Sequence, residues 1–242
     1  MIEFRLGLIN PNTNSEQTEA MRGVAEQVLD EKSEVVAATA ARGPRSIETA
    51  ADHVIAEPET LALVRSMTYV DAYLIACFSD PALDAAREVT EAPVVGIGEA
   101  AYIAAARMAK RFAVLTTLPR SVPELEDALD RQGLTRRCVG VIPMGVPVEE
   151  QGIENELAYA AILERGRAAI AERGAEALVL ACGGMADSAR SASRDLGVPV
   201  CDGVAFGALL AYALVRSGLR TSKVGAYAWP DSAPGVASDR GH

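Results

Sequence analysis

The sequence predicts an α/β protein of two pseudo-symmetric lobes, each with a mainly parallel four-stranded sheet flanked by helices, around a shared cleft. The first observation is a repeated stretch: residues 71–77 and 176–182 each run from an acidic residue through apolar residues to a cysteine. The second is a common offset, since Cys182 follows Cys77 by 105 residues (182 − 77) and neighbouring segments recur in the same order. The third is the alternation of short apolar runs with alanine-rich helical segments, which is typical of parallel sheets.

Four strands and the helices between them are predicted in the first half of the chain. Residues 4–9 form the first strand, and Thr13 with Glu16 has the spacing of a capping box that opens the first helix. Asp80 is a favourable N-cap before Pro81, because proline suits the first position of a helix. The other predicted strands are 35–39, 71–77 and 93–97, and the predicted helices are 14–29, 49–57, 59–68, 81–90 and 99–110, the last of which crosses between the lobes.

The second half repeats this order. Its first strand is 112–116, and Ser121 with Glu124 has the spacing of a second capping box, which opens a helix to Gln132. The other predicted strands are 138–142, 176–182 and the segment at 199–201, and the other helices are 154–172, 186–196 and 204–217. We therefore expect a first lobe of residues 1–98 plus 216–242 and a second lobe of residues 99–215.

Composition excludes several classes of partner. The net charge of −10 and the pI of about 4.8 argue against a nucleic acid or an anionic membrane, which favour a basic surface. The apolar runs are too short to span a membrane, and the chain begins with a strand, so we expect no signal peptide and a cytoplasmic protein. Its four cysteines show no metal-binding spacing and its histidines number two, so we expect no metal site and no Ser-His-Asp triad.

Cys77 and Cys182 are the candidate catalytic residues. Each is expected at the carboxyl end of a strand and just before a helix, where open α/β sheets place their ligands. A thiol acts as a base when it is a thiolate, and a helix N-terminus lowers its pKa. Two facing cysteines suit a 1,1-proton transfer, in which one thiolate removes a proton from a carbon acid and the opposite thiol protonates the other face. The alternative is that both thiols are small buried core side chains.

A set of hydrogen-bonding residues, all but Asp80 neutral, is predicted to bind the substrate. The reasons are their position after the carboxyl ends of strands and the need to stabilise an oxyanion beside the carbanion. Turn chemistry alone explains asparagines in such places, and His53 is expected at the surface of a polar helix. The candidate binding residues are Asn10, Asn12, Ser79, Asp80, Thr116, Thr117, Gly183 and Gly184.

Short segments over nearly the whole chain resemble the aspartate/glutamate/hydantoin racemase superfamily, and within it the hydantoin and allantoin racemase branch. The matching segments are 9–13 (INPNT), 43–48 (GPxSIE), 76–81 (ACFxDP), 83–88 (LDAARE), 93–101 (PVVGIGEAA), 182–185 (CxGM), 197–200 (GVPV) and 218–223 (GLxTSK). The resemblance implies a cofactor-independent racemase that inverts C5 of a 5-substituted hydantoin or of allantoin, a homo-oligomer with its active site between the lobes. It also implies that Cys77 and Cys182 are the two catalytic cysteines.

Two departures from the family pattern concern the substituent at C5 of the substrate. Ser79 stands where the family usually has glycine or aspartate, and residues 49–53 (TAADH) replace a segment that commonly contains Tyr-Asp-Glu. The segment 78–81 is closer to the hydantoin type, whereas 116–126 and 221–228 are closer to the allantoin type. The sequence therefore leaves open whether the substrate is allantoin or another hydantoin.

Two other functions stay open. A malonate-type decarboxylase or a maleate-type isomerase of the same superfamily would act on a carboxylate and would favour a cationic clamp, for which only Arg42 and Arg45 are candidates. A non-catalytic protein would bind a small amide-rich ligand in the same cleft. The paired cysteines favour the racemase, because a decarboxylase that uses one cysteine leaves the other idle.

Overall fold

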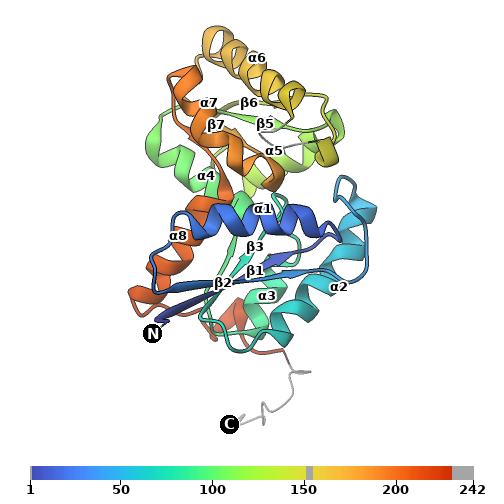
Figure 1. Ribbon diagram of the computed structural model, residues 1–242, viewed down its shortest axis with the longest axis vertical. Coiled ribbons are helices and arrows are strands. Elements are labelled where there is room, and N and C mark those ends of the chain that lie inside the picture. The colour runs from blue at the N-terminus through green and yellow to red at the C-terminus, as the bar shows by residue number, and fades with distance from the viewer. Residues whose placement is uncertain (1, 151–154, 231–242) are drawn as a thin grey trace.

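The protein, described here by a computed structural model, consists of two parallel four-stranded sheets, one in each lobe (Figure 1). The structure describes residues 2–150 and 155–230. The first sheet has the strand order β2-β1-β3-β4 and the second β6-β5-β7-β8, so the two lobes have the same topology. The strands are β1 Phe4–Asn10, β2 Ser33–Thr39, β3 Ala72–Ile75, β4 Val94–Gly96, β5 Phe112–Thr116, β6 Cys138–Pro143, β7 Ala177–Leu180 and β8 Val200–Cys201. The predicted fold class and the internal repeat are confirmed.

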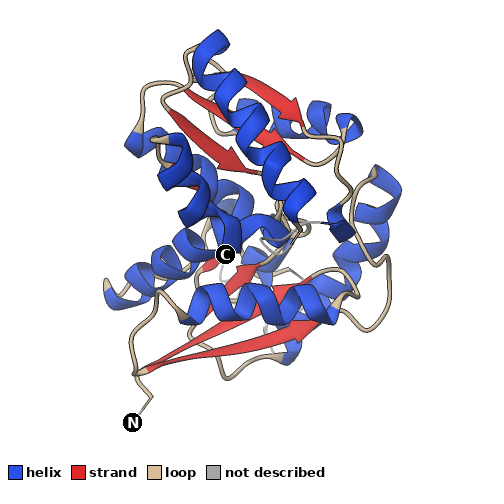
Figure 2. Ribbon diagram, turned by 45° about the horizontal axis from the view of Figure 1, so that its top comes forward, coloured by secondary structure: helices blue, strands red, loops and turns tan. Residues whose placement is uncertain are grey.

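Helices cover both faces of each sheet (Figure 2). In the first lobe α1 and α8 pack on one face and α2 and α3 on the other, and in the second lobe α4 and α5 lie opposite α6 and α7. The central strands β3 and β7 are buried along their whole length, as their apolar sequences require. The helices are α1 Ser15–Glu26, α2 Ala50–Ser66, α3 Leu83–Val89, α4 Ile97–Met108, α5 Val122–Arg131, α6 Glu156–Arg173, α7 Ala189–Leu196 and α8 Gly203–Arg216.

The chain crosses between the lobes twice. After β4 it enters α4, which packs against the second sheet, and after β8 it enters α8, which packs against the first sheet. The crossing by α4 agrees with the predicted crossing helix. The division of the chain into lobes stays a proposal, and the packing of α8 favours counting residues 203–216 with the first lobe. Residues 231–242 of the expected first lobe lie outside the described residues.

Both predicted capping boxes are wrong. Helix α1 is capped by Asn14, whose side chain accepts the Gln17 N–H at 3.3 Å, because Thr13 is bound instead to the carbonyl oxygen of Pro44. Ser121 makes no capping hydrogen bond, since a short 3₁₀ turn leads directly into α5. Its partner in the expected box, Glu124, is therefore available for another contact.

Helix α2 is continuous, whereas two helices separated at Pro58 were predicted. Pro58 lies inside α2 and removes one backbone hydrogen bond. Three residues on one side of the helix, Ala56, Thr60 and Val64, are buried and hold both halves against the sheet. Tertiary packing therefore outweighs the local effect of the proline. No helix in the described ranges is long and apolar enough to cross a membrane.

Asp80 and Pro81 do not begin a helix as predicted. Asp80 has a positive φ of 52° and Ala82 one of 59°, and α3 begins only at Leu83. The Asp80 side chain instead caps α4, because its oxygens accept the N–H groups of Gly98 at 2.9 Å and Glu99 at 2.8 Å. This contact ties the turn after Cys77 to the helix that crosses to the second lobe.

Candidate active site

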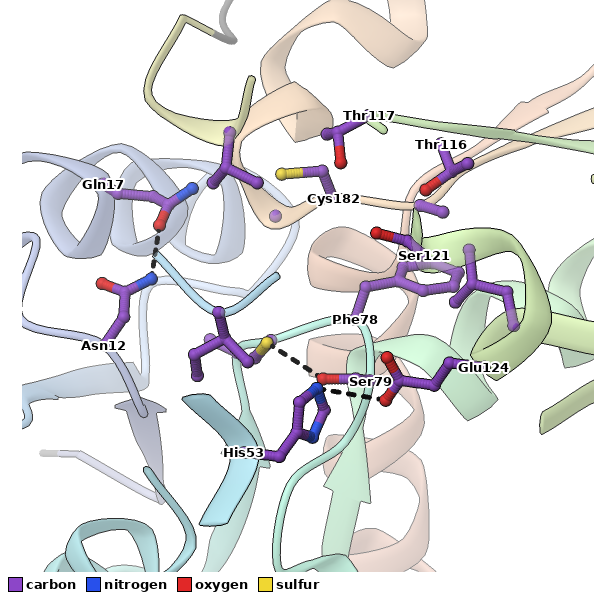
Figure 3. A pocket seen from close by; sticks show the side chains of 17 residues that line it. Asn12, Gln17, His53, Phe78, Ser79, Thr116, Thr117, Ser121, Glu124 and Cys182 are labelled. Atoms are coloured by element: carbon purple, nitrogen blue, oxygen red, sulfur yellow. Dashed lines mark hydrogen bonds and ion pairs between the residues drawn. The ribbon is translucent and has the colours of Figure 1, made fainter. Parts of the chain in front are cut away.

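Cys77 and Cys182 line one small cleft between the lobes (Figure 3). Cys77 follows β3 of the first sheet and Cys182 follows β7 of the second, each just after the carboxyl end of a central strand. The cleft has a volume of about 50 Å³. Besides the cysteines its lining residues are Asn12, Gln17, Ile47, His53, Ala76, Phe78, Ser79, Thr116, Thr117, Ser121, Glu124, Leu125, Val148, Ala181 and Gly183.

The two sulfur atoms have equivalent backbone surroundings, and Cys77 has an additional side-chain contact. The Cys77 Sγ lies 3.4 Å from the Ser79 hydroxyl, and it also accepts the backbone N–H of Ser79. The Cys182 Sγ accepts the backbone N–H of Gly184, which is again the second residue after the cysteine. A backbone N–H group thus lies beside each sulfur atom, where it favours the thiolate.

Burial nevertheless raises the pKa of both thiols, which corrects the lowered values expected from the sequence. The pKa of Cys77 is raised to about 11 and that of Cys182 to about 12, mainly because burial disfavours the charged thiolate. The expected helix N-termini are absent, since Cys182 precedes a six-residue 3₁₀ turn and α3 begins six residues after Cys77. Both thiols are therefore protonated at neutral pH in the unliganded protein.

Five of the predicted binding residues line the cleft, and three do not. Thr116 and Thr117 are buried at the end of β5, and Asn12, Ser79 and Gly183 lie around the cysteines. Asn12 is held in place because its amide donates to the Gln17 side chain at 2.8 Å. The residues outside the lining are Asn10, Asp80 and Gly184.

Asn10 lies behind the cleft and organises the turn after β1. Its side-chain nitrogen lies 2.9 Å from Asn12 Oδ1, 3.0 Å from the Asn14 carbonyl and 2.9 Å from Thr18 Oγ1. Its Oδ1 accepts the Asn12 N–H at 3.2 Å. The side chain is fully buried and its hydrogen-bonding capacity is used within the protein. Asn10 therefore positions Asn12, and Asp80 positions α4.

The sequence did not single out an ion pair at the edge of the cleft. His53 from α2 and Glu124 from α5 approach to 3.1 Å between Nε2 and Oε1, so the pair joins the two lobes (Figure 3). The hydrogen bond to Glu124 is the largest cause of a raised His53 pKa, with smaller contributions from Glu57 and Asp52. A weak signal was present, because His53 falls in the segment that departs from the family pattern.

The arrangement can move a proton between two faces of a small neutral molecule. Two thiols line the cleft from opposite lobes, and threonine and serine hydroxyls line the same cleft. Neither lysine nor arginine is among the residues that line the cleft in the described part of the chain. Arg42 and Arg45 form ion pairs with Glu59 and Glu16 outside it.

Comparison with known proteins gives consistent matches over nearly the whole chain. The family model of Asp/Glu/Hydantoin racemase matches residues 6–211. The hydantoin racemase of Rhizobium meliloti is 42% identical over 229 residues, covering 94% of this chain and 95% of the relative. The hydantoin racemase of Pseudomonas sp. (strain NS671) is 38% identical over 232 residues, covering 94% and 92%.

Solved structures agree with these matches. The allantoin racemase from Klebsiella pneumoniae superposes with a TM-score of 0.92 at 38% identity, covering 95% of this chain and 94% of that one. A maleate cis-trans isomerase from Nocardia farcinica has a TM-score of 0.63 and an arylmalonate decarboxylase one of 0.58, both at 17% identity. They cover 89% and 88% of this chain and 93% of each of those chains. At that identity the likeness shows the fold alone.

Proposed function

The chain belongs to the Asp/Glu/hydantoin racemase family, and we propose that it is a racemase that inverts C5 of 5-substituted hydantoins, allantoin included. The observation that carries the proposal is the pair of cysteines that line one cleft from opposite lobes. Inversion needs a base on one face of C5 and an acid on the other, and two thiols of equivalent position supply both. The matched relatives named hydantoin racemase and allantoin racemase support the same chemistry.

Because both thiols are protonated at neutral pH, in the proposed mechanism one of them first loses its proton to solvent, and the active form has one cysteine as thiolate and the other as thiol. The thiolate takes the C5 proton, and the electron pair of the C–H bond moves onto the ring carbonyl beside C5. The opposite thiol then protonates C5 from the other face, so the stereocentre is inverted and the charge has passed to the second sulfur. Each cysteine is the base for one enantiomer and the acid for the other.

Neutral groups stabilise the carbanion in this proposal. The hydroxyls of Thr116, Thr117 and Ser79 line the cleft, and donors that point at a developing oxyanion lower the barrier. Asn12 and the backbone at Gly183 bind the edge of the ring. Asn10, Asp80 and Gly184 serve as supports, through their hydrogen bonds to the cleft turn, to α4 and to the Cys182 sulfur.

The other candidate functions have weaker support. A malonate-type or maleate-type substrate carries carboxylates, and the only cationic side chain among the described residues at the cleft is His53, which is paired with Glu124. The non-catalytic hypothesis explains the hydrogen-bonding groups but not the equivalent positions of two thiols. A cofactor-independent reaction, a homo-oligomer and a cytoplasmic location remain predictions.

The test is a polarimetric screen of enantiopure 5-substituted hydantoins and both enantiomers of allantoin. We expect the optical rotation of at least one substrate to decay to zero faster than without protein, with no added cofactor. Cys138→Ser is the matched control, because Cys138 lies at the start of β6 outside the cleft. If no substrate lost optical rotation faster than in buffer alone, the proposed function would be wrong.

A further inference from the structure

The His53–Glu124 ion pair lies at the boundary between the small cleft and a larger groove. The groove has a volume of about 870 Å³ and lies along α2, α3 and α5. Four residues line both the cleft and the groove, namely His53, Phe78, Ser79 and Glu124. These four residues form the boundary between the two cavities, so a group that reaches from the cleft into the groove passes the ion pair.

The size of the cleft decides which part of a substrate reaches the pair. Its volume of about 50 Å³ holds a few water molecules, because each water molecule requires roughly 10–15 Å³. A hydantoin ring between the two sulfur atoms leaves no room for a long substituent beside it. The substituent at C5 must extend through an opening, and the groove beyond His53 and Glu124 provides the space.

We propose that His53 and Glu124 select a ureido substituent at C5, so that allantoin is preferred to a hydantoin with an alkyl substituent. The inference rests on the proposed function and specifies its substrate. A ureido group has N–H donors and one carbonyl acceptor. A carboxylate accepts N–H groups through both oxygens, and an imidazolium donates to a carbonyl.

The pair has hydrogen-bonding capacity to spare. Glu124 uses Oε1 in its contact with His53, and among the side chains described within residues 2–150 and 155–230 its Oε2 has no hydrogen-bond partner. The carboxylate of Glu124 holds the pKa of His53 above its ordinary value, which favours the charged donor. His53 has a side chain that is 15% exposed and Glu124 one that is 39% exposed, so both remain reachable.

An alkyl substituent at C5 would be disfavoured, because it forms no hydrogen bonds with His53 or Glu124. It would displace water from a carboxylate and an imidazolium and offer them no hydrogen bonds. Removing water from charged groups without such compensation is unfavourable. Sites built to hydrogen-bond a substrate group discriminate strongly against analogues that lack it.

The experiment compares two substrates of nearly equal shape, enantiopure allantoin and 5-isobutylhydantoin. In the second, methylene, methine and methyl groups replace the nitrogen atoms and the carbonyl of the ureido group. The value measured is the ratio of kcat/KM for allantoin to kcat/KM for 5-isobutylhydantoin. A ratio within one protein is independent of how much of that protein is folded.

We expect this ratio to be about 10 or more in the wild type. Glu124→Gln should lower the ratio about tenfold, because it weakens a hydrogen bond to a charged group. His53→Gln should lower it in the same direction. Glu124→Leu should lower it further and raise kcat/KM for 5-isobutylhydantoin, a gain that misfolding does not produce. Glu126→Gln is the matched control, because it removes the same charge from an exposed position of α5 and should keep the wild-type ratio.

Failure of this inference differs from failure of the proposed function. If the wild type racemises both substrates and Glu124→Gln slows both equally, the pair only joins the lobes and the inference is overturned. A wild-type ratio near one also overturns it. If the wild type racemises neither substrate nor any other hydantoin, the proposed function is wrong and the inference falls with it.

Discussion

Burial determines the protonation state of the two cysteines. Their pKa values, about 11 for Cys77 and about 12 for Cys182, lie well above neutral pH. Below its pKa a thiol gains thiolate about tenfold with each pH unit, and only the thiolate reacts with iodoacetamide. We therefore expect the alkylation rate of both cysteines, followed by peptide mass spectrometry, to rise about tenfold per unit from pH 7 to 10. A plateau near pH 8 would contradict the raised pKa values.

The roles of Cys77 and Cys182 can be separated by isotope exchange. We expect Cys77→Ser and Cys182→Ser each to lower racemisation by about 10²–10⁴-fold, the usual contribution of a positioned acid or base. The surviving cysteine can still remove the C5 proton of the enantiomer that faces it and return deuterium from D2O. Proton NMR of the C5 signal should then show exchange without inversion, in one enantiomer for each variant. Exchange of the same enantiomer in both variants would exclude the two-base assignment, once spontaneous exchange is subtracted.

Asn10 is the residue whose expected role changes most with the structure. Its side chain binds the turn after β1 and does not line the cleft. We expect Asn10→Ala to lower the free energy of unfolding by about 1–3 kcal/mol, because it leaves buried polar groups without a partner. Urea denaturation measures this loss. A variant of unchanged stability but lower kcat/KM would instead point to direct contact with the substrate.

At the scale of elements, the turn after Cys77 is fixed to α4 through a close backbone approach. A Cβ atom added at Gly98 would lie 2.0 Å from the carbonyl oxygen of Phe78 and 2.9 Å from the Asp80 carboxylate. Neither the backbone nor the capping carboxylate can move without losing the cap. Glycine is therefore required at this position.

We expect Gly98→Ala to lower the free energy of unfolding by about 1–3 kcal/mol, as overpacking of a filled site does. Gly23→Ala is the matched control, because Gly23 lies inside α1 with open space around its Cα. That change should stabilise the protein by about 0.5–1 kcal/mol, since alanine favours a helix. Thermal unfolding of both variants compares them, and equal effects would refute the close approach.

At the scale of the whole molecule, a ligand in the cleft contacts both lobes at once. We expect racemic allantoin, for which no net reaction occurs, to stabilise both lobes together by about 2.7 kcal/mol at one hundred times its Kd. In a chain of this size, each kcal/mol of stabilisation raises Tm by about 2–4 °C. Differential scanning calorimetry should show one transition that moves as a whole. Two transitions, of which only one moves, would show that the ligand binds a single lobe.

The sequence by itself determined the fold class, the repeat and the two cysteines. Apolar runs such as 72–75 and 177–180 are strong local signals for buried strands. The internal repeat shows that these two runs are equivalent strands of the two halves, and it can be seen without knowledge of the tertiary structure. The sequence also predicted the side chains that follow the strands, Asn12, Ser79, Thr116 and Thr117, because strand ends of a parallel sheet meet at one edge. These features depend on residues close together in the chain.

Only the tertiary structure decided what depends on distant partners. Asp80 reads as a local N-cap but caps α4, and Glu124 has the spacing of a capping box but pairs with His53, since each partner comes from a separate element. The raised pKa values of Cys77 and Cys182 likewise follow from burial between two lobes, which outweighs the local hydrogen bonds of each turn. Burial and long-range contacts depend on the whole chain, so they cannot be predicted from a short segment of the sequence.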